Sequence, residues 1–276
     1  MPPGSIWPRP PAPADVEAIA TRGSAEAAED MRRHFATGLP YAFIAQIDLA
    51  EAAILSPATG VLPTEGRLLF FCDIIVGCYD TGTRSCHVIW DRTPAEEISS
   101  CPVPEDLAAA EHKYREEMRG ISVTYAMDVA VVEREGTNYG TRSRALKLAA
   151  EFTFPHEMTD EGQSFWAMSG TVPYPDQDEV WHRSKLLGCS DPEQGDPRWD
   201  AVVALEYGVQ HLSGERWREC RTDIALKARD WRLLLQLDLA DWMQAELVEG
   251  TVYFLIQHED LALRRFERVV TVHQQT

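Results

Sequence analysis

The sequence predicts an α+β fold in one domain, with mostly antiparallel sheets built from two related strand–helix–strand units and an N-terminal helical segment. Three observations predict it. Apolar runs of strand length lie between loops rich in Pro and Gly. One pattern of polar and apolar residues occurs twice, within residues 41–92 and 229–273. Residues 14–34 are rich in Ala, Glu and Arg, a composition typical of amphipathic helices.

Length and composition predict the domain organisation. The chain has 276 residues, of which 45% are hydrophobic and 25% charged, as in a globular protein with a sizeable core. Residues 1–13 are rich in proline and lack the basic and apolar regions of a secretion signal. We therefore expect a flexible leader at 1–13 and a single domain at 14–276, with internal duplication at about 41–92 and 229–273.

The elements of the first half follow from apolar spacing and from turn residues. Residues 14–34 predict one or two helices, which end before Gly38. Three runs of β-branched and aromatic residues between turns predict strands at 41–48, 67–76 and 85–90. Apolar residues at helical spacing predict a helix over 104–119, with Pro104 suited to its first position.

The elements of the second half are predicted in the same way. Residues 121–133 are rich in β-branched residues and predict further β-structure. Residues 146–154 alternate between apolar and polar types, which predicts a strand with one buried face. A loop is expected over 162–178 and a short helix near 198–207. Apolar runs toward the C-terminus predict strands at 231–238, 251–257 and 268–272.

Two stretches of the chain share the pattern that defines the repeated unit. Residues 43–51 read FIAQIDLAE, and residues 233–241 read LLLQLDLAD. Residues 66–71 then read GRLLFF, and residues 250–255 read GTVYFL. The offset is 190 at the glutamine and 184 at the glycine, so the first loop is six residues longer than the second.

Alternation along a strand divides the side chains of each unit between two faces. The predicted buried faces are apolar and consist of Phe43, Ala45, Ile47 and Leu49 in the first unit and Leu233, Leu235, Leu237 and Leu239 in the second. Gln46 and Asp48 lie on the opposite face, as do Gln236 and Asp238. Each Asp stands at the N-cap of a following helix. The glycine that opens the next strand suits a turn with positive φ.

The polar side chains Gln46, Asp48, Gln236 and Asp238 have two interpretations. In the first, each Asp caps a helix and each Gln satisfies buried polar groups. In the second, the two pairs converge about a pseudo-twofold axis and line one ligand or metal site. No residue is assigned as a metal ligand and no cofactor is expected. The six cysteines form no C-x-x-C pair, and the usual cofactor motifs are absent.

Several motifs resemble those of the YwqG-like family of bacterial proteins. In the first half they are AQIDL at 45–49, Leu62-Pro63 and GRLLFF at 66–71. In the second half they are His182, Leu186-Leu187-Gly188, Asp191-Pro192 and Gln194-Gly195-Asp196-Pro197, followed by 231–238, 250–256 and 260–266. Before the first strand, Trp7-Pro8 alone resembles the family's Gly-Gly…Pro…Trp-Pro stretch.

This resemblance covers most of residues 40–276. It implies a duplicated, mostly antiparallel α+β domain, and it implies no biochemical activity because the family is one of unknown function. It also implies an association with polymorphic-toxin gene clusters, which suggests a partner class without giving a mechanism.

Residues 188–197 form the candidate functional loop. The loop holds Asp191, Gln194 and Asp196, and His182 lies six residues before its first glycine. A histidine near carboxylates suits acid–base chemistry or metal binding. The alternative is a rigid polar loop that packs against the sheet, with Gln194 satisfying backbone groups.

Charge and missing motifs guide the functional expectation. The net charge of −18 disfavours nucleic acid and anionic membranes as partners and favours a basic protein. No apolar run approaches the ~20 residues that span a bilayer. Phosphate-loop, dinucleotide, hydrolase-elbow and zincin motifs are absent, which lowers the expectation of catalysis.

We therefore expect a non-catalytic, cytoplasmic binding protein, of the immunity type that masks a basic partner. One alternative is a hydrolase-like enzyme that uses His182 with Asp191 or Asp196. Another is a small-ligand sensor that binds between the two repeats. The oligomeric state stays open.

Overall fold

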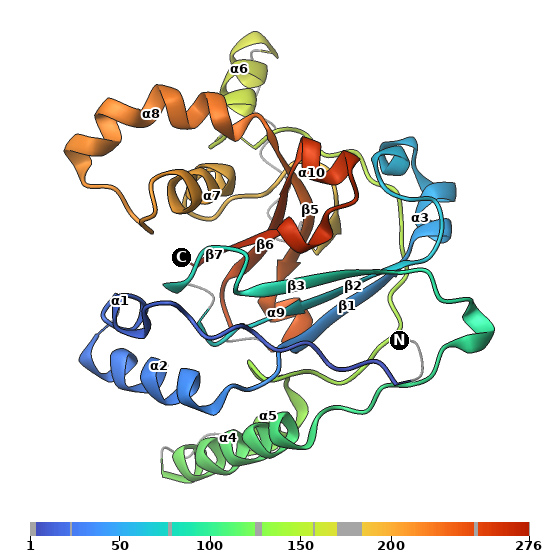
Figure 1. Ribbon diagram of the computed structural model, residues 1–276, viewed down its shortest axis with the longest axis vertical. Helices are drawn as coiled ribbons and strands as arrows, with labels where there is room; N and C mark the ends of the chain where they lie inside the picture. Colours follow the sequence, from blue (N-terminus) through green and yellow to red (C-terminus); the bar gives the residue numbers. More distant parts are fainter. Residues whose placement is uncertain are drawn as a thin grey trace.

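Two antiparallel sheets form the centre of the molecule in the computed structural model, which describes residues 4–22, 24–76, 79–124, 129–156, 158–169, 184–245 and 248–275. Helices α6, α7 and α8 lie toward one end and α4 and α5 toward the other, with the strands between them (Figure 1). The predicted α+β class with antiparallel sheets is confirmed.

Each sheet is ordered as its strands follow in the chain. The first sheet has the order β1-β2-β3, with β1 (Ala42–Asp48), β2 (Arg67–Cys72) and β3 (Cys86–Asp91). The second sheet has the order β4-β5-β6-β7, with β4 (Lys185–Leu186), β5 (Trp231–Asp238), β6 (Thr251–Gln257) and β7 (Val270–Gln274). All neighbouring strands pair antiparallel.

The predicted N-terminal helical segment forms two helices, α1 (Val16–Ala20) and α2 (Ala25–Thr37). The later α-helices are α3 (Leu49–Leu55), α4 (Glu105–Thr124), α5 (Val129–Arg134), α6 (Asp160–Ser169), α7 (Pro197–Glu206), α8 (Gly214–Ala228), α9 (Leu239–Met243) and α10 (His258–Ala262). Short 3-10 helices cover Pro57–Val61, Ala95–Glu97 and Phe266–Arg268. Within the described ranges, no helix is both long and apolar enough to cross a membrane.

The two repeated units have the same local structure at their helix starts. Asp48 caps α3, because its carboxylate accepts a hydrogen bond from the Glu51 N–H at 2.9 Å. Asp238 caps α9 in the same way, accepting from the Asp241 N–H at 2.6 Å. The backbone angles agree closely, with φ −74° and ψ 123° at Asp48 and φ −76° and ψ 122° at Asp238.

The glycines at the start of β2 and β6 also match. Gly66 has φ +78° and Gly250 has φ +118°, conformations that other residues rarely adopt. A Cβ on Gly66 would lie 2.5 Å from the Asp91 carbonyl oxygen. A Cβ on Gly250 would lie 2.7 Å from Nε2 of His273, on the matching third strand. Both positions therefore require glycine for backbone conformation and for space.

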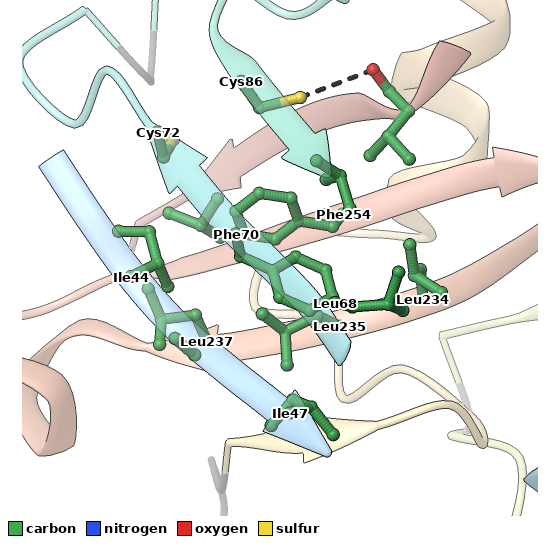
Figure 2. Close-up of a cluster of buried hydrophobic side chains, with 14 of the residues drawn as sticks. Ile44, Ile47, Leu68, Phe70, Cys72, Cys86, Leu234, Leu235, Leu237 and Phe254 are labelled. Carbon is green, nitrogen blue, oxygen red and sulfur yellow. Dashed lines mark hydrogen bonds between the residues drawn. The ribbon is translucent and has the colours of Figure 1, made fainter. Parts of the chain in front are cut away.

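The two units share one hydrophobic core. Phe70 and Phe254, which match at the offset of 184, are both fully buried, and their rings meet edge to face at 5.3 Å between centroids. Figure 2 shows them among aliphatic side chains from both sheets. The Trp242 indole N–H donates to the Ile44 carbonyl at 3.2 Å, which links α9 of the second unit to β1 of the first.

A β-bulge changes the predicted face of the first strand in each unit. The pairing register shifts between Phe43 and Ala45 in β1, and between Leu233 and Leu235 in β5. The extra residue reverses the alternation that precedes it. Phe43 therefore packs with Tyr41 and Phe71 outside the shared core, so the prediction of one continuous face was wrong at that position. Leu233 likewise joins a separate cluster.

The middle of the chain departs from the prediction. Residues 121–124 continue α4 and residues 129–134 form α5, where β-structure was predicted. Helix propagation from α4 overrides the β-branched composition, and Val123 remains 71% exposed. Residues 146–154 form no strand, because no neighbouring strand pairs with them among the described residues, and Phe152 is 97% exposed. Helix α6 (Asp160–Ser169) begins two residues before the predicted loop of 162–178 and continues into it, so the loop prediction was wrong over 162–169.

Part of the proline-rich leader covers the first sheet. The Trp7 ring packs edge to face against Phe71, with 5.5 Å between centroids, and its indole N–H donates to the Tyr41 carbonyl at 2.8 Å. The Tyr41 N–H in turn donates to the Pro8 carbonyl at 3.2 Å. Arg9 forms an ion pair with Asp106 at 2.7 Å.

Candidate functional site

The 188–197 loop lies on the second sheet and is held there by a buried glutamine of β5. Gln236 is fully buried, and its side-chain carbonyl accepts a hydrogen bond from the Asp191 N–H at 2.9 Å. Its amide group donates to the Asp191 carboxylate at 3.2 Å. The Tyr253 hydroxyl donates to the Asp191 carbonyl at 2.7 Å. The predicted amide pairing of Gln236 is thus a feature of the fold.

A second glutamine, which the sequence reasoning missed, fixes the middle of the same loop. The Gln274 side-chain carbonyl accepts from the N–H groups of Glu193 at 3.1 Å and Gln194 at 3.2 Å. Its amide group donates to the Gly195 carbonyl at 2.8 Å and to the Asp200 carboxylate at 2.9 Å. The sequence feature that could have identified Gln274 was its position as a glutamine at the end of an apolar strand. Gln194 reaches on to the Gln275 carbonyl.

Asp196 ends the loop as a structural cap. Its buried carboxylate accepts from the Arg198 N–H at 3.1 Å and caps α7. It also forms an ion pair with the Arg198 guanidinium at 2.6 Å, and Glu161 contacts the same guanidinium at 2.5 Å. Burial acts to lower the pKa of Arg198, but its hydrogen bonds to the two carboxylates outweigh burial and raise that pKa.

These contacts bear on the predicted acid–base group. His182 lies outside the described residues. Asp191 forms an ion pair with Lys185, and Asp196 is engaged by Arg198. Both carboxylates therefore hold the 188–197 loop in place, which favours its interpretation as a rigid polar loop.

The structure separates the two Gln–Asp pairs. Gln46 and Asp48 are exposed and line a cleft of about 530 Å³ between the repeats. Gln236 lies under the 188–197 loop, and Asp238 caps α9 while its N–H donates to the Ser184 hydroxyl at 3.3 Å. The predicted convergence of all four side chains on one pocket does not occur.

The cleft brings together distant parts of the chain. One wall is β1, and the facing wall is the extended segment 141–148. Strands β4 and β5 and the indole of Trp242 complete it. Its apolar lining residues are Phe43, Ile44, Ala45, Ile47, Ala145, Leu146, Leu148, Leu186, Leu235, Leu237 and Trp242.

The charged groups of the cleft nearly balance. Its carboxylates are those of Asp48, Glu51 and Asp241, and its cations are those of Arg142, Arg144, Lys147 and Lys185. Arg144 is paired with Asp241 at 3.1 Å, and Lys185 is paired with Asp191 outside the cleft. The cleft therefore suits a ligand of mixed character better than a strongly charged one.

The open edge of β1 faces this cleft. In the second sheet β4 pairs with the matching edge of β5, placing Lys185 opposite Gln236 and Leu186 opposite Leu235. The Leu187 N–H also donates to the Leu234 carbonyl at 3.1 Å. In antiparallel geometry this pattern directs the backbone N–H and C=O of Gln236 toward β4.

By equivalence, the backbone groups of Gln46 point from β1 into the cleft. Among the described residues β1 pairs with β2 alone, and the 141–148 segment makes no backbone hydrogen bond to it. At the bulge of β1, the Ile44 carbonyl accepts a hydrogen bond from the Trp242 indole N–H. The matching Leu234 carbonyl of β5 accepts instead from the backbone N–H of Leu187, the residue that follows β4. Within the described part of the chain, the first sheet thus has no counterpart of β4.

The thiols of the core are poor nucleophiles. Burial raises the pKa of Cys86 to about 12, and burial also raises the pKa of Cys72. Cys86 donates to the Val269 carbonyl at 3.4 Å (Figure 2). Across the described ranges, no group of three or more His, Cys, Asp or Glu side chains is placed to hold a metal ion.

Comparison with known proteins gives a family match. A family model described as a domain of unknown function (DUF1963) matches residues 1–274. No curated protein matches this chain.

Proposed function

From the premise that this chain belongs to the DUF1963 family, a family of unknown function, we propose that it is a non-catalytic binding protein. It takes an extended segment of a partner protein into the cleft between its repeats. The segment adds to the open edge of β1 as a fourth strand of the first sheet. The finer relation to YwqG-like proteins remains a resemblance carried by the motifs of residues 40–276.

One observation carries this proposal. The edge of β5 at Gln236 is paired with β4, while the matching edge of β1 at Gln46 lines an open cleft of about 530 Å³. An unpaired strand edge presents a row of backbone donors and acceptors that favours another strand. Recognition by strand addition uses these groups for affinity and the alternate side chains for specificity.

Strand β4 supplies the expected pattern of the added segment. It places Lys185 opposite Gln236 and Leu186 opposite Leu235. A segment in the same register would place a polar residue opposite Gln46 and an apolar residue opposite Ala45. The apolar side chain would meet Leu235 and Trp242, which line the cleft. A basic side chain beside Gln46 would lie near Asp48 and Glu51.

A basic partner is the proposed class. The net charge of −18 speeds the encounter with a basic protein, while the nearly neutral cleft selects the bound segment. A toxin masked by an immunity-type protein would be one such partner, and the proposal assumes a cytoplasmic protein. Capture of a basic partner should weaken as salt rises, because salt screens the long-range attraction.

A synthetic peptide tests the binding mode. The probe is a fluorescein-labelled SKLLG peptide, which copies residues 184–188, and its affinity is measured by fluorescence anisotropy. N-methylation at its lysine nitrogen removes the donor expected to meet the Gln46 carbonyl, and we expect at least tenfold weaker binding. N-methylation at the next leucine nitrogen, which points away from β1, is the matched control and should preserve binding.

Variants of the protein at Gln46 test the same backbone pairing between the peptide and β1. Gln46→Pro removes the strand-edge N–H and should abolish binding, while Gln46→Ala keeps the backbone and should bind normally. Thermal unfolding without peptide checks that both variants fold. Equal affinity of both methylated peptides would contradict strand addition, and no binding of any peptide or basic partner would contradict the proposed function.

A further inference from the structure

A second pocket, of about 460 Å³, lies apart from the cleft and shares no lining residue with it. We propose that this pocket binds a small organic anion, and that the guanidinium groups of Arg229 and Arg232 recognise its carboxylate or phosphate. The pocket forms where the end of α8, the start of β5 and the start of α10 meet the 188–197 loop.

The charge of this pocket is inverted relative to the chain. Asp and Glu outnumber Lys and Arg by 44 to 26 in the whole sequence. The pocket is lined instead by Arg198, Arg229, Arg232 and His258, with Glu161 as its one carboxylate. Three arginines against one carboxylate make a local basic site in an acidic protein, which attracts anions.

Two of the three arginines are available for a ligand. Arg198 is neutralised by Asp196 at 2.6 Å and by Glu161 at 2.5 Å. Arg229 and Arg232 are exposed, and neither forms an ion pair with any residue in the described part of the chain. Neither guanidinium is therefore neutralised by a salt bridge, although the charge of Arg229 helps to lower the pKa of Glu161 in the same pocket.

Backbone hydrogen bonds and a buried side chain fix the positions from which the Arg229 and Arg232 side chains extend. Arg229 is the C-cap of α8, with its N–H bonded to the Leu226 carbonyl at 3.3 Å. Trp231 lies between the two arginines in the sequence and is the first residue of β5. Its buried side chain anchors this end of the strand. The His258 N–H donates to the Asp230 carbonyl at 2.8 Å, which ties the start of α10 to the same turn.

The imidazole of His258 lines the same pocket as the arginines. Burial lowers the pKa of His258, and the charges of Arg232 and Arg198 lower it further, although Asp230 acts in the opposite direction. These arginines therefore lie within electrostatic reach of the imidazole. A bound anion would reverse their effect and favour the protonated ring.

The interior of the pocket fits the apolar body of a ligand. Its lining includes the buried side chains of Leu187, Leu233 and Leu255, together with Trp231 and the partly buried Val61. Ligand sites commonly combine such an apolar lining with a few convergent polar groups and have volumes of about 300–1,000 Å³. A pair of arginines matches the planar geometry of carboxylates and phosphates.

The experiment uses three probes on the full chain: phenyl phosphate, phenylacetate and inorganic phosphate. Binding is measured by isothermal titration calorimetry, with benzyl alcohol as the uncharged comparison. We expect at least one aromatic anion to bind, and to bind more tightly than inorganic phosphate and benzyl alcohol. The tighter of the two aromatic anions identifies the preferred head group.

The double variant Arg229→Gln/Arg232→Gln should bind that anion at least tenfold more weakly. Arg216→Gln, an exposed arginine of α8 outside the pocket, is the matched control and should leave binding unchanged. The His258 NMR titration should move to higher pH in the presence of the anion and should not move in the double variant.

Absence of binding by every anion would overturn the proposal, as would equal binding by the double variant. Inorganic phosphate binding as tightly as both aromatic anions would overturn the role of the apolar lining. Unfolding curves of both variants without ligand establish that a loss of binding does not come from misfolding.

Discussion

Two partly buried titratable residues, Asp200 and His273, affect stability with opposite dependences on pH. Burial raises the pKa of Asp200 to about 6, although the hydrogen bond from the Gln274 amide opposes this rise. Burial lowers the pKa of His273 to about 4, and neither ring nitrogen has a hydrogen-bond partner in the described structure. Burial therefore disfavours the charged form of each residue, which is the ionised carboxylate of Asp200 and the protonated imidazole of His273.

Asp200→Asn should stabilise the protein at neutral pH. Folded Asp200 binds its proton more tightly than the unfolded chain does, so its ionisation costs stability above about pH 6 and costs nothing below about pH 4. Asparagine keeps an acceptor for Gln274 without the charge. We expect a gain on the order of 2 kcal/mol at pH 7 by urea unfolding, disappearing near pH 4.

Comparison at one pH removes the contribution of His273, which destabilises the wild type and the variant equally as pH falls from about 6.5 toward 4. Asp30→Asn, at an exposed ion pair with Arg33, is the control and should change stability little. A gain that persists unchanged at pH 4 would show that charge burial is not its cause.

The repeated unit works at the scale of the element, because each Asp ends a strand and starts a helix. We expect Asp48→Ala and Asp238→Ala each to lower the free energy of unfolding by about 1 kcal/mol, through loss of the bonds to Glu51 N–H and Asp241 N–H. Asp48→Asn keeps a capping acceptor and should lose much less. Urea unfolding checks both, and equal losses in Ala and Asn variants would exclude capping as the cause.

The sequence pattern was sufficient to predict the elements of these units because the residues that determine them are close together in the chain. Caps, turn glycines and apolar runs lie within a few residues of one another, so the strands and helices of both units were predicted. The bulges at Ile44 and Leu234 were not, because a bulge depends on the pairing of a partner strand. Residues 146–154 failed for a related reason, since alternation alone does not supply a neighbouring strand.

The candidate site was predicted only in part. Gln46 and Asp48 line the cleft as candidate binding residues, but the facing segment 141–148 and the Trp242 indole come from distant sequence. Gln236 has a local sequence similar to that of Gln46 and a different role, because the 188–197 loop covers it. A local sequence pattern does not show that a loop distant in the chain covers the glutamine of the second repeat and leaves that of the first repeat exposed.

At the scale of the whole molecule, two similar units share a core and differ at their edges. Phe70 and Phe254 meet at the centre of that core (Figure 2). The second sheet is completed by β4, while in the part of the chain that the structure describes the first sheet ends at β1 beside the cleft. Among the described residues this difference leaves the edge of β1 unpaired, and it is the edge at which we propose that a partner segment binds.

Amide hydrogen exchange at Gln46 and Gln236, followed by NMR, tests this difference directly. In the free protein the Gln236 N–H should exchange slowly, because it faces β4, and the Gln46 N–H should exchange far faster. Saturating SKLLG peptide should slow exchange at Gln46 and leave Gln236 unchanged. Equal protection of both amides in the free protein, or no slowing at Gln46 with bound peptide, would contradict an open strand position on β1.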